Sequence, residues 1–312
     1  MEYRLLGRTG IKVSALSFGA SSLGGVFREV DETEAIDSVR TALELGINFI
    51  DVSPFYGLNR AEIVLGKSLQ GFSRDKYILA TKVGRYGSEM KDFDFSPQRV
   101  PASVEESLVR LGVEYVDLIQ VHDIEFGDLD QIIGQTIPAL RELQRQGRTR
   151  FVGVTGLPLA ALRRAVLAVP VDTILSYCHY ELNDTALTGL IPALKQRGVG
   201  IISASPLGMG LLSNRGTPSW HPAPARVKRA CANAAAHCQA RDASIEKLAI
   251  QFSLANPDIA TTLVGSANPK NMRKNIAWAS EPIDRTLLNE VRQILEPVHN
   301  VTWPSGRPEN NS

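Results

Sequence analysis

Eight short apolar runs recur along the chain, separated by longer stretches in which apolar residues recur with a helical period. The runs are rich in Val, Ile and Leu and lack the strict alternation of a strand that faces water on one side. Each is therefore typical of a strand buried on both faces. We predict strands at residues 13–18, 48–52, 78–82, 116–121, 151–154, 173–177, 200–203 and 261–264.

Helix boundaries are marked between these runs. Residues 31–34, Asp-Glu-Thr-Glu, have the pattern of a capping box, and Gly46 follows where that helix should end. Ser96 before Pro97 indicates a second helix start, and Gly112 closes the apolar stripe that follows. A helix between consecutive strands predicts parallel pairing with right-handed crossovers.

Strand–helix units repeated in this way form either an open doubly wound sheet or a closed barrel. Eight strands and a length of 312 residues favour the α/β class and a (β/α)8 TIM barrel, as a single domain over residues 1–312. Residues 1–10, which contain Arg-Thr-Gly at 8–10, should form an N-terminal hairpin that covers the barrel bottom. Residues 208–243 are too many for one helix and predict an insertion between strands 7 and 8.

Composition narrows the function classes. The formal net charge is +1, from 34 Lys and Arg against 33 Asp and Glu, which argues against nucleic acid or a membrane surface as partner. We find no apolar run long enough to span a bilayer and no signal peptide. Three sparse cysteines favour a reducing, cytoplasmic location. A histidine lies next to a cysteine at two places, Cys178–His179 and His237–Cys238. Neither place has the spacing of four ligands that a zinc site needs, so we expect no metal.

Ionisable residues gather where the predicted strands end, which is where barrels of this kind place their active sites. Asp51 and Tyr56 follow the second strand, Lys82 ends the third, and His122 follows the fourth. A buried lysine needs a partner, and Asp51 is the available carboxylate. A lysine cation beside Tyr56 should lower the pKa of the phenol, while His122 can donate a hydrogen bond to a substrate oxygen.

Such a site can move a proton while a hydride moves at carbon, and the hydride requires a cofactor because no side chain carries one. A different enzyme class would use Lys82 as a Schiff-base nucleophile in aldol chemistry.

The four residues and their contexts resemble the catalytic tetrad of the aldo-keto reductases. The contexts are Gly-Ile-Asn-Phe-Ile-Asp-Val-Ser-Pro-Phe-Tyr-Gly at 46–57, Ala-Thr-Lys-Val-Gly at 80–84 and Asp-Leu-Ile-Gln-Val-His at 117–122. Within this family, segments 122–127, 174–180, 203–212, 220–223 and 295–306 resemble plant sugar dehydrogenases. The likeness covers nearly the whole chain.

The resemblance implies NAD-dependent oxidation of L-galactose or a similar aldose at C1 to a lactone, with Tyr56 as general base. It leaves open an L-fucose or D-arabinose dehydrogenase, a general aldehyde reductase, and a non-enzymatic redox-sensing subunit. The oligomeric state is not indicated.

The resemblance also implies a dinucleotide extended across the barrel top without a Rossmann domain. The implied cofactor positions are Gly19, Ala20, Thr155, Ser176, Ser205, Pro206, Leu207, Gly210, Gly265, Ser266, Asn271 and Asn275. The chain departs from the common family pattern at Thr155, Gly156, Ser176 and Ala204. Relatives that prefer NADP usually carry Lys at the position of Gly265 and Arg at that of Asn271, so NAD is expected and NADP is less favoured.

A sugar site needs polar groups and often an aromatic platform. The candidate substrate contacts are Tyr56, His122, Asp123, Phe55, Tyr86 and Trp303. Asp123 directly follows His122, so on an unbroken strand its side chain would point elsewhere. We expect Asp123 to be either a hydroxyl acceptor or a structural cap. The acidic segment 123–130 should disfavour anionic substrates.

Overall fold

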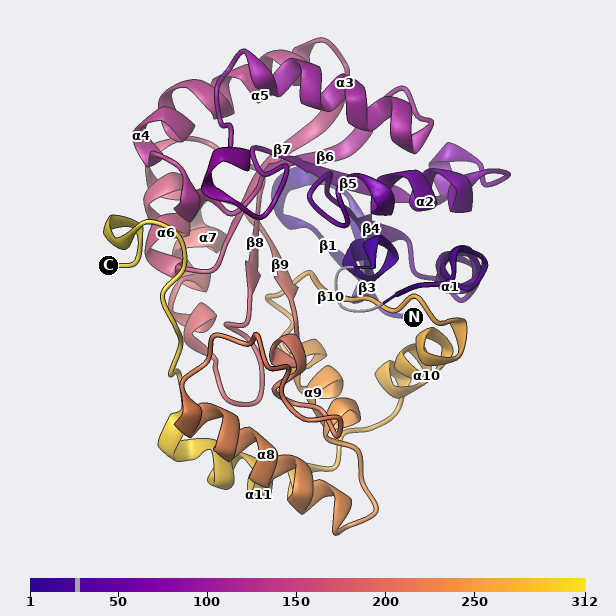
Figure 1. Ribbon diagram of the computed structural model, residues 1–312, viewed down its shortest axis with the longest axis vertical. Helices are drawn as coiled ribbons and strands as arrows, with labels where there is room; N and C mark the ends of the chain where they lie inside the picture. The colour runs from indigo at the N-terminus through magenta and orange to yellow at the C-terminus, as the bar shows by residue number, and fades with distance from the viewer. Residues whose placement is uncertain (26–28) are drawn as a thin grey trace.

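Eight parallel strands close into a barrel in the computed structural model, which describes residues 1–25 and 29–312 (Figure 1). The strand order around the barrel is β10-β3-β4-β5-β6-β7-β8-β9. The strands are β3 (Leu16–Gly19), β4 (Phe49–Asp51), β5 (Ile78–Val83), β6 (Val116–Val121), β7 (Thr149–Gly156), β8 (Thr173–Tyr177), β9 (Gly200–Ala204) and β10 (Thr261–Val264). The predicted (β/α)8 barrel is confirmed.

Helices surround this barrel, as a parallel sheet requires. They are α1 (Glu32–Glu44), α2 (Arg60–Leu69), α3 (Arg99–Leu111), α4 (Leu129–Gln131), α5 (Ile137–Arg145), α6 (Leu159–Ala168), α7 (Ile191–Gln196), α8 (Ala225–Gln239), α9 (Ile245–Leu254), α10 (Pro269–Ser280) and α11 (Arg285–Leu295). Within the part of the chain that the structure describes, no helix is long and apolar enough to cross a bilayer.

Two of the predicted helix boundaries have the expected caps, and a third helix boundary lies later in the chain than predicted. The Asp31 side chain accepts from the backbone N–H of Glu34 at 2.8 Å at the start of α1. Helix α3 begins at Arg99 with Gln98 as its N-cap residue, so the start predicted at Ser96 and Pro97 was too early, although Ser96 Oγ accepts from the backbone N–H of Arg99 at 3.3 Å. Gly112 ends α3 with a φ of 68°, a left-handed conformation that glycine adopts without strain.

The predicted N-terminal hairpin is formed by β1 (Tyr3–Leu5) and β2 (Lys12–Ser14), which pair antiparallel. Leu6, Ile11 and Val13 from this hairpin join the apolar cluster inside the barrel. The run predicted as one strand at 13–18 is wrong in one respect, because it contains the end of β2 and most of β3, which continues to Gly19. Both strands are buried there, so the apolar pattern continues across their boundary.

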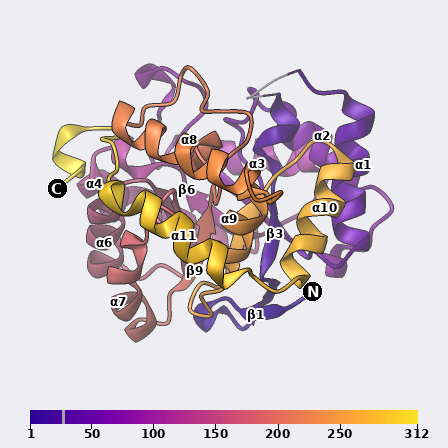
Figure 2. The same cartoon turned by 90° about the horizontal axis from the view of Figure 1, so that it is seen from below.

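The predicted insertion before the last strand is also present. The chain leaves β9 through a short turn at Gly208–Gly210, crosses an irregular segment and enters α8, before α9 leads to β10. Helix α8 packs beside α11, and Figure 2 shows the two helices lying next to each other on the side of the molecule that faces the viewer.

Candidate active site

The alternation of strand side chains brings the predicted site residues to the inside of the barrel. The inner layer nearest the hairpin is apolar and includes Phe49, Ala80 and Leu118. Two residues further along the same strands stand Asp51, Lys82 and Gln120. Because side chains two apart share a face, these three also point inward, one layer closer to the carboxyl ends of the strands.

Lys82 is the centre of this layer, with only 1% of its side chain exposed. Its ammonium pairs with Asp51 and donates to the Val52 carbonyl at 2.9 Å and to the Tyr56 hydroxyl at 3.2 Å. Gln120 Nε2 donates to the other oxygen of Asp51 at 2.7 Å. Burial alone would lower the pKa of Lys82, but Asp51 and Tyr56 outweigh it and hold the pKa above its ordinary value. Lys82 therefore stays charged.

Tyr56 lies on the loop after β4, with its ring edge-on to His122 at a centroid distance of 5.7 Å. Burial raises the pKa of Tyr56, and this effect exceeds the lowering effect of Lys82. The expected net decrease in the phenol pKa is therefore wrong for the protein alone, although Lys82 acts in the expected direction. At neutral pH the Tyr56 hydroxyl keeps its proton.

His122 follows β6 and is held by a loop residue. Its Nδ1 lies 3.0 Å from Ser53 Oγ, which itself accepts from the Phe55 backbone N–H at 3.1 Å. Burial, followed by the charges of Lys82 and Arg85, holds the pKa of His122 well below its usual range, so the ring is neutral. Its Nε2 faces a carboxylate oxygen of Asp123 at 3.7 Å. A lone pair there would face negative charge, so we assign the ring hydrogen to Nε2.

Asp123 reaches the site because β6 ends at Val121. The φ of Asp123 is 48°, and its backbone N–H donates to Thr155 Oγ1 at 2.9 Å. Its carboxylate pairs with Arg85, and its side chain is 5% exposed. Arg85 thus balances the charge of Asp123 at the inner end of the acidic segment 123–130, and the expected exclusion of anionic substrates stays a prediction.

The other predicted substrate residues separate into two groups. Phe55 lies at the site, with its ring 5.9 Å from those of Tyr56 and His122. Tyr86 instead accepts a hydrogen bond from the Gly84 backbone and carries the Arg99 guanidinium over its ring. Tyr86 is therefore engaged with α3.

Trp303 packs edge-on against His221 at 5.0 Å and is 8% exposed. This contact places Trp303 beside the segment that follows β9. The C-terminal tail that carries it contains no α-helix.

The predicted cofactor positions form two groups at the carboxyl ends of the strands. Gly19, Ala20 and Gly265 meet where β3 and β10 end, and a Cβ on Gly265 would lie 2.0 Å from the Gly19 carbonyl oxygen. Asn271 and Asn275 follow on α10, four residues apart and thus on one face. Ser266 stands before that helix and accepts from the Asn268 backbone N–H at 3.1 Å.

The second group follows β8 and β9. Ser176 is the last residue but one of β8, and its hydroxyl is buried without a hydrogen-bond partner among residues 1–25 and 29–312. After β9, the chain passes through Ser205, Pro206 and Leu207 to Gly210. Left-handed backbone recurs in this segment, with φ values of 59° at Ser205, 51° at Met209 and 105° at Gly210. At residues other than glycine, here Ser205 and Met209, left-handed backbone is strained, and such strain concentrates at functional sites.

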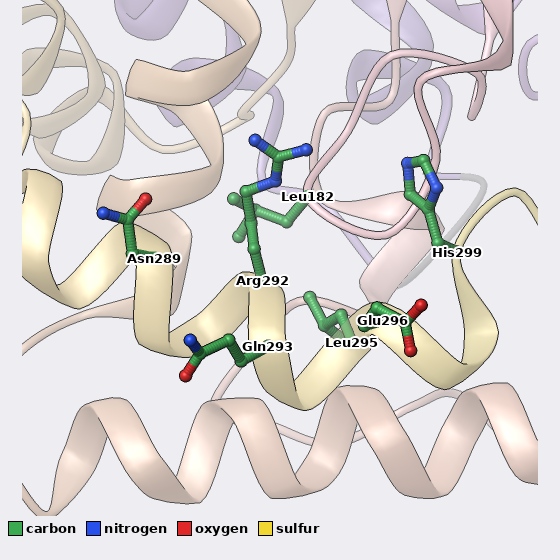
Figure 3. Close-up of a pocket in the computed structure, with 7 residues that line it drawn as sticks. All are labelled: Leu182, Asn289, Arg292, Gln293, Leu295, Glu296 and His299. Carbon is green, nitrogen blue, oxygen red and sulfur yellow. The ribbon is translucent and has the colours of Figure 1, made fainter.

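A surface hollow of about 550 Å³ lies elsewhere on the molecule. Its lining residues are Leu182, Asn289, Arg292, Gln293, Leu295, Glu296 and His299. Figure 3 shows that most of these side chains come from α11 and the turn after it. None of the predicted site residues lines this hollow.

Three residues that hold the site were missed in the sequence. Gln120 could have been found, because it lies two residues before His122 on the same face of β6. Ser53 and Arg85 lie in segments after strand ends, where no periodic pattern tells which way a side chain points. Their contacts with His122 and Asp123 depend on the folded loops.

A closed barrel with a buried lysine between a carboxylate and a tyrosine at its carboxyl end is typical of barrel oxidoreductases. The family model described as the aldo/keto reductase family matches residues 15–296. The chain belongs to the aldo/keto reductase family, whose members use a nicotinamide cofactor.

Several known proteins are similar to this chain. The chain is 51% identical to the L-galactose dehydrogenase of Arabidopsis thaliana, with 99% of both chains covered. It is 29% identical to the D-threo-aldose 1-dehydrogenase of a Pseudomonas species, over 91% of this chain and 94% of that one. Among solved structures, the holo form of an aldo-keto reductase from Bacillus halodurans matches with a TM-score of 0.80 and 27% identity, covering 100% of both chains.

The residues present at the barrel top fit a dinucleotide. The unpartnered Ser176 hydroxyl offers a donor and an acceptor to a carboxamide, and the left-handed backbone after β9 can turn successive N–H groups toward a phosphate. Thr155, by contrast, already accepts from the Asp123 backbone. Its contact with the cofactor remains a prediction.

Proposed function

We propose that this protein oxidises L-galactose, or a closely similar aldose, at C1 to the lactone with NAD as oxidant. The proposal is supported by 51% identity over nearly full length to an L-galactose dehydrogenase. The structural observation that carries it is the Tyr56 hydroxyl, which lies 3.2 Å from the ammonium of Lys82 at the mouth of the barrel. This contact gives the site a proton carrier.

Each residue of the tetrad has a distinct role in this proposal. Tyr56 takes the proton of the anomeric hydroxyl, while Lys82 stabilises the phenolate that accepts it. Asp51 keeps Lys82 charged and in place. The Nε2–H of His122 donates to the C1 oxygen and fixes it beside Tyr56. When bound, the oxidised nicotinamide supplies the hydride acceptor and a positive charge.

The atoms and electrons of this reaction balance. The C1–H bond gives its hydride to NAD, the hydroxyl proton goes to Tyr56, and the C1–O bond becomes the carbonyl of the lactone. The proton then passes from Tyr56 to water. Because the Tyr56 phenol is protonated in the protein alone, oxidation through this residue is favoured at alkaline pH.

The expected preference for NAD is supported at Gly265. A side chain there would collide with the Gly19 carbonyl, since its Cβ would lie 2.0 Å from that oxygen. A lysine at this position, as in relatives that prefer NADP, therefore cannot be accommodated without moving the backbone. Asn271 likewise offers no cation to a 2′-phosphate. Charge-assisted hydrogen bonds of this kind are worth about 1.5–3 kcal/mol each.

The function is tested by assaying L-galactose, L-fucose and D-arabinose, each with NAD and NADP. We expect the highest kcat/KM for L-galactose with NAD. A higher value for L-fucose or D-arabinose would reassign the substrate within the aldose class. Reduction of simple aldehydes without oxidation of any aldose would contradict the proposal, as would a higher kcat/KM with NADP.

The role of Tyr56 is tested by Tyr56→Phe, which removes only the hydroxyl. We expect turnover to fall by at least about 100-fold, in line with the loss of general acid–base catalysis. NAD binding, measured by the quenching of tryptophan fluorescence, should remain near the wild-type value. Turnover near wild type would exclude Tyr56 as the proton carrier.

A further inference from the structure

Arg85 occupies a position at the mouth of the barrel to which neither the tetrad nor the cofactor positions give a role. It lies three residues after Lys82, and its guanidinium carbon stands 3.6 Å from the centroid of the Phe55 ring. Phe93 and Phe126 also face the guanidinium, at 5.2 and 5.5 Å. The Arg85 side chain is 18% exposed, so it is packed among aromatic rings but still open at the site.

Asp123, the ion-pair partner of Arg85, is also held in place by several contacts. Arg85 Nη1 donates to Asp123 Oδ2, and the same oxygen lies 3.7 Å from His122 Nε2. The second oxygen, Oδ1, lies 3.5 Å from Thr155 Oγ1. The carboxylate of Asp123 therefore stands between the guanidinium and the ring nitrogen that faces the reacting oxygen.

Burying the charges of Arg85 and Asp123 costs free energy if the pair has only a structural role. Removing two charges from water is expensive, and an apolar pair of similar volume often stabilises a fold equally well. A rigid carboxylate beside a guanidinium is, however, well suited to adjacent hydroxyl groups. The carboxylate accepts hydrogen bonds, and the guanidinium donates several in a fixed plane.

We propose that the Arg85–Asp123 pair, held on the Phe55 ring, recognises the sugar hydroxyl at C2, next to the reacting carbon. The inference rests on the proposed aldose oxidation. With the C1 oxygen between Tyr56 and His122, the neighbouring hydroxyl falls beside Asp123, because Asp123 Oδ2 is the carboxylate oxygen next to His122 Nε2. The C2 hydroxyl donates to Asp123 and accepts from Arg85, so Arg85 is a specificity-determining residue.

The first test compares L-galactose with 2-deoxy-L-galactose in the wild-type enzyme, Arg85→Met and Asp123→Asn. Losing a hydrogen bond to a charged group should raise KM for L-galactose by about 10- to 100-fold, with a smaller effect on kcat. The wild-type enzyme should handle the 2-deoxy sugar poorly, and the variants should add little further loss. Calorimetry with the lactone and the enzyme–NADH complex should show the same weakening as KM.

Arg99→Met is the matched control. Arg99 also stands over an aromatic ring, that of Tyr86, and pairs with Glu106 on α3. The Arg99→Met variant should have the wild-type KM for both sugars. Arg85→Lys, which keeps the charge but loses the planar donors, serves if Arg85→Met does not fold, and should give an intermediate KM.

If the variants raised KM by the same factor for L-galactose and for the 2-deoxy sugar, the inference would be overturned. The pair would then affect KM only by supporting the structure of the site. An unchanged KM in the variants would also overturn the inference. A wild-type enzyme that oxidises no aldose would instead reject the proposed function itself. NAD affinity should be the same in all variants, which separates loss of hydroxyl recognition from loss of the fold.

Discussion

Glu125 is a carboxyl group enclosed at the barrel top, two residues beyond Asp123. Its Oε1 accepts from the Leu157 backbone N–H at 3.2 Å and from Ser305 Oγ at 2.9 Å. Its Oε2 has no hydrogen-bond partner in the part of the chain that the structure describes. Burial, together with the nearby charge of Asp123, raises the pKa of Glu125 from 4.5 to about 8. The carboxyl is therefore neutral in the folded protein at pH 7.

This shift predicts a pH-dependent stability. Between pH 4.5 and about 8 the folded protein holds a proton on Glu125 that the unfolded chain releases, so the stabilising contribution is complete below pH 4.5 and decreases up to about pH 8. One such group changes the free energy of unfolding by at most about 1.4 kcal/mol per pH unit. Glu125→Gln should make the decrease between pH 5 and 8 shallower by up to that amount in urea unfolding.

Glu309→Gln is the control for Glu125→Gln, since Glu309 is an exposed carboxylate on the same tail. It should leave the pH dependence at the wild-type slope. Parallel pH profiles for the wild type and Glu125→Gln would show that Glu125 is ionised in the folded protein.

The residues that could be predicted from the sequence lie on a strand or, like Tyr56 and His122, carry a family motif after a strand end. Asp51 and Lys82 lie on strands whose apolar run fixes which residues face inward. Glu125 was not among the predicted site residues, because burial of a loop carboxyl has no periodic signal. Arg85 was missed for the same reason. Its contact with Phe55 depends on how two separate loops fold over the barrel mouth.

At the scale of elements, the segment between β9 and α8 contains the residue that stabilises the left-handed turn after β9. His221 Nδ1 accepts from the Ala223 backbone N–H at 3.1 Å, so its hydrogen is on Nε2, which donates to the Gly208 carbonyl at 2.9 Å. Burial lowers the pKa of His221, which keeps the ring neutral. Trp303 from the C-terminal tail packs against the same ring. The inserted segment and the tail thus both support the turn after β9.

His221→Phe tests whether this support matters for the dinucleotide that we expect at Ser205–Gly210. Losing one hydrogen bond to the turn should raise the Kd for NAD by about 3- to 10-fold, with a smaller change in KM for the sugar. The Kd is measured by fluorescence titration. His237→Phe on α8, where His237 pairs with Glu290, is the control and should bind NAD as the wild type does. An unchanged Kd in His221→Phe would place the turn outside the cofactor site.

Element boundaries were predictable where a local signal marks them, and less so where two buried segments adjoin. Gly112 and Asp31 mark their helix ends through backbone conformation and a side-chain cap. The boundary between β2 and β3 has no such marker, since Val13 and Leu16 are both fully buried. There the tertiary fold alone separates the hairpin from the barrel.

At the scale of the whole molecule, the two ends of the chain close the two ends of the barrel. The N-terminal hairpin inserts Leu6 and Val13 into the barrel interior. The C-terminal tail crosses toward the other end, where Asn310 Nδ2 donates to the carbonyls of Glu125 and Gly127 at 2.9 and 3.0 Å. The last strand, β10, pairs with both β3 and β9, so the barrel closes between the first and the last of its own strands.

We therefore expect residues 1–312 to unfold as one unit. The three tryptophans, Trp220, Trp278 and Trp303, report on the C-terminal third, whereas far-UV circular dichroism reports on the whole chain. Thermal transitions followed by the two signals should coincide. NAD at 100 times its Kd should move both together, through about 2.7 kcal/mol of added stability. Two separate transitions, or a shift in only one signal, would show that the barrel consists of independently unfolding parts.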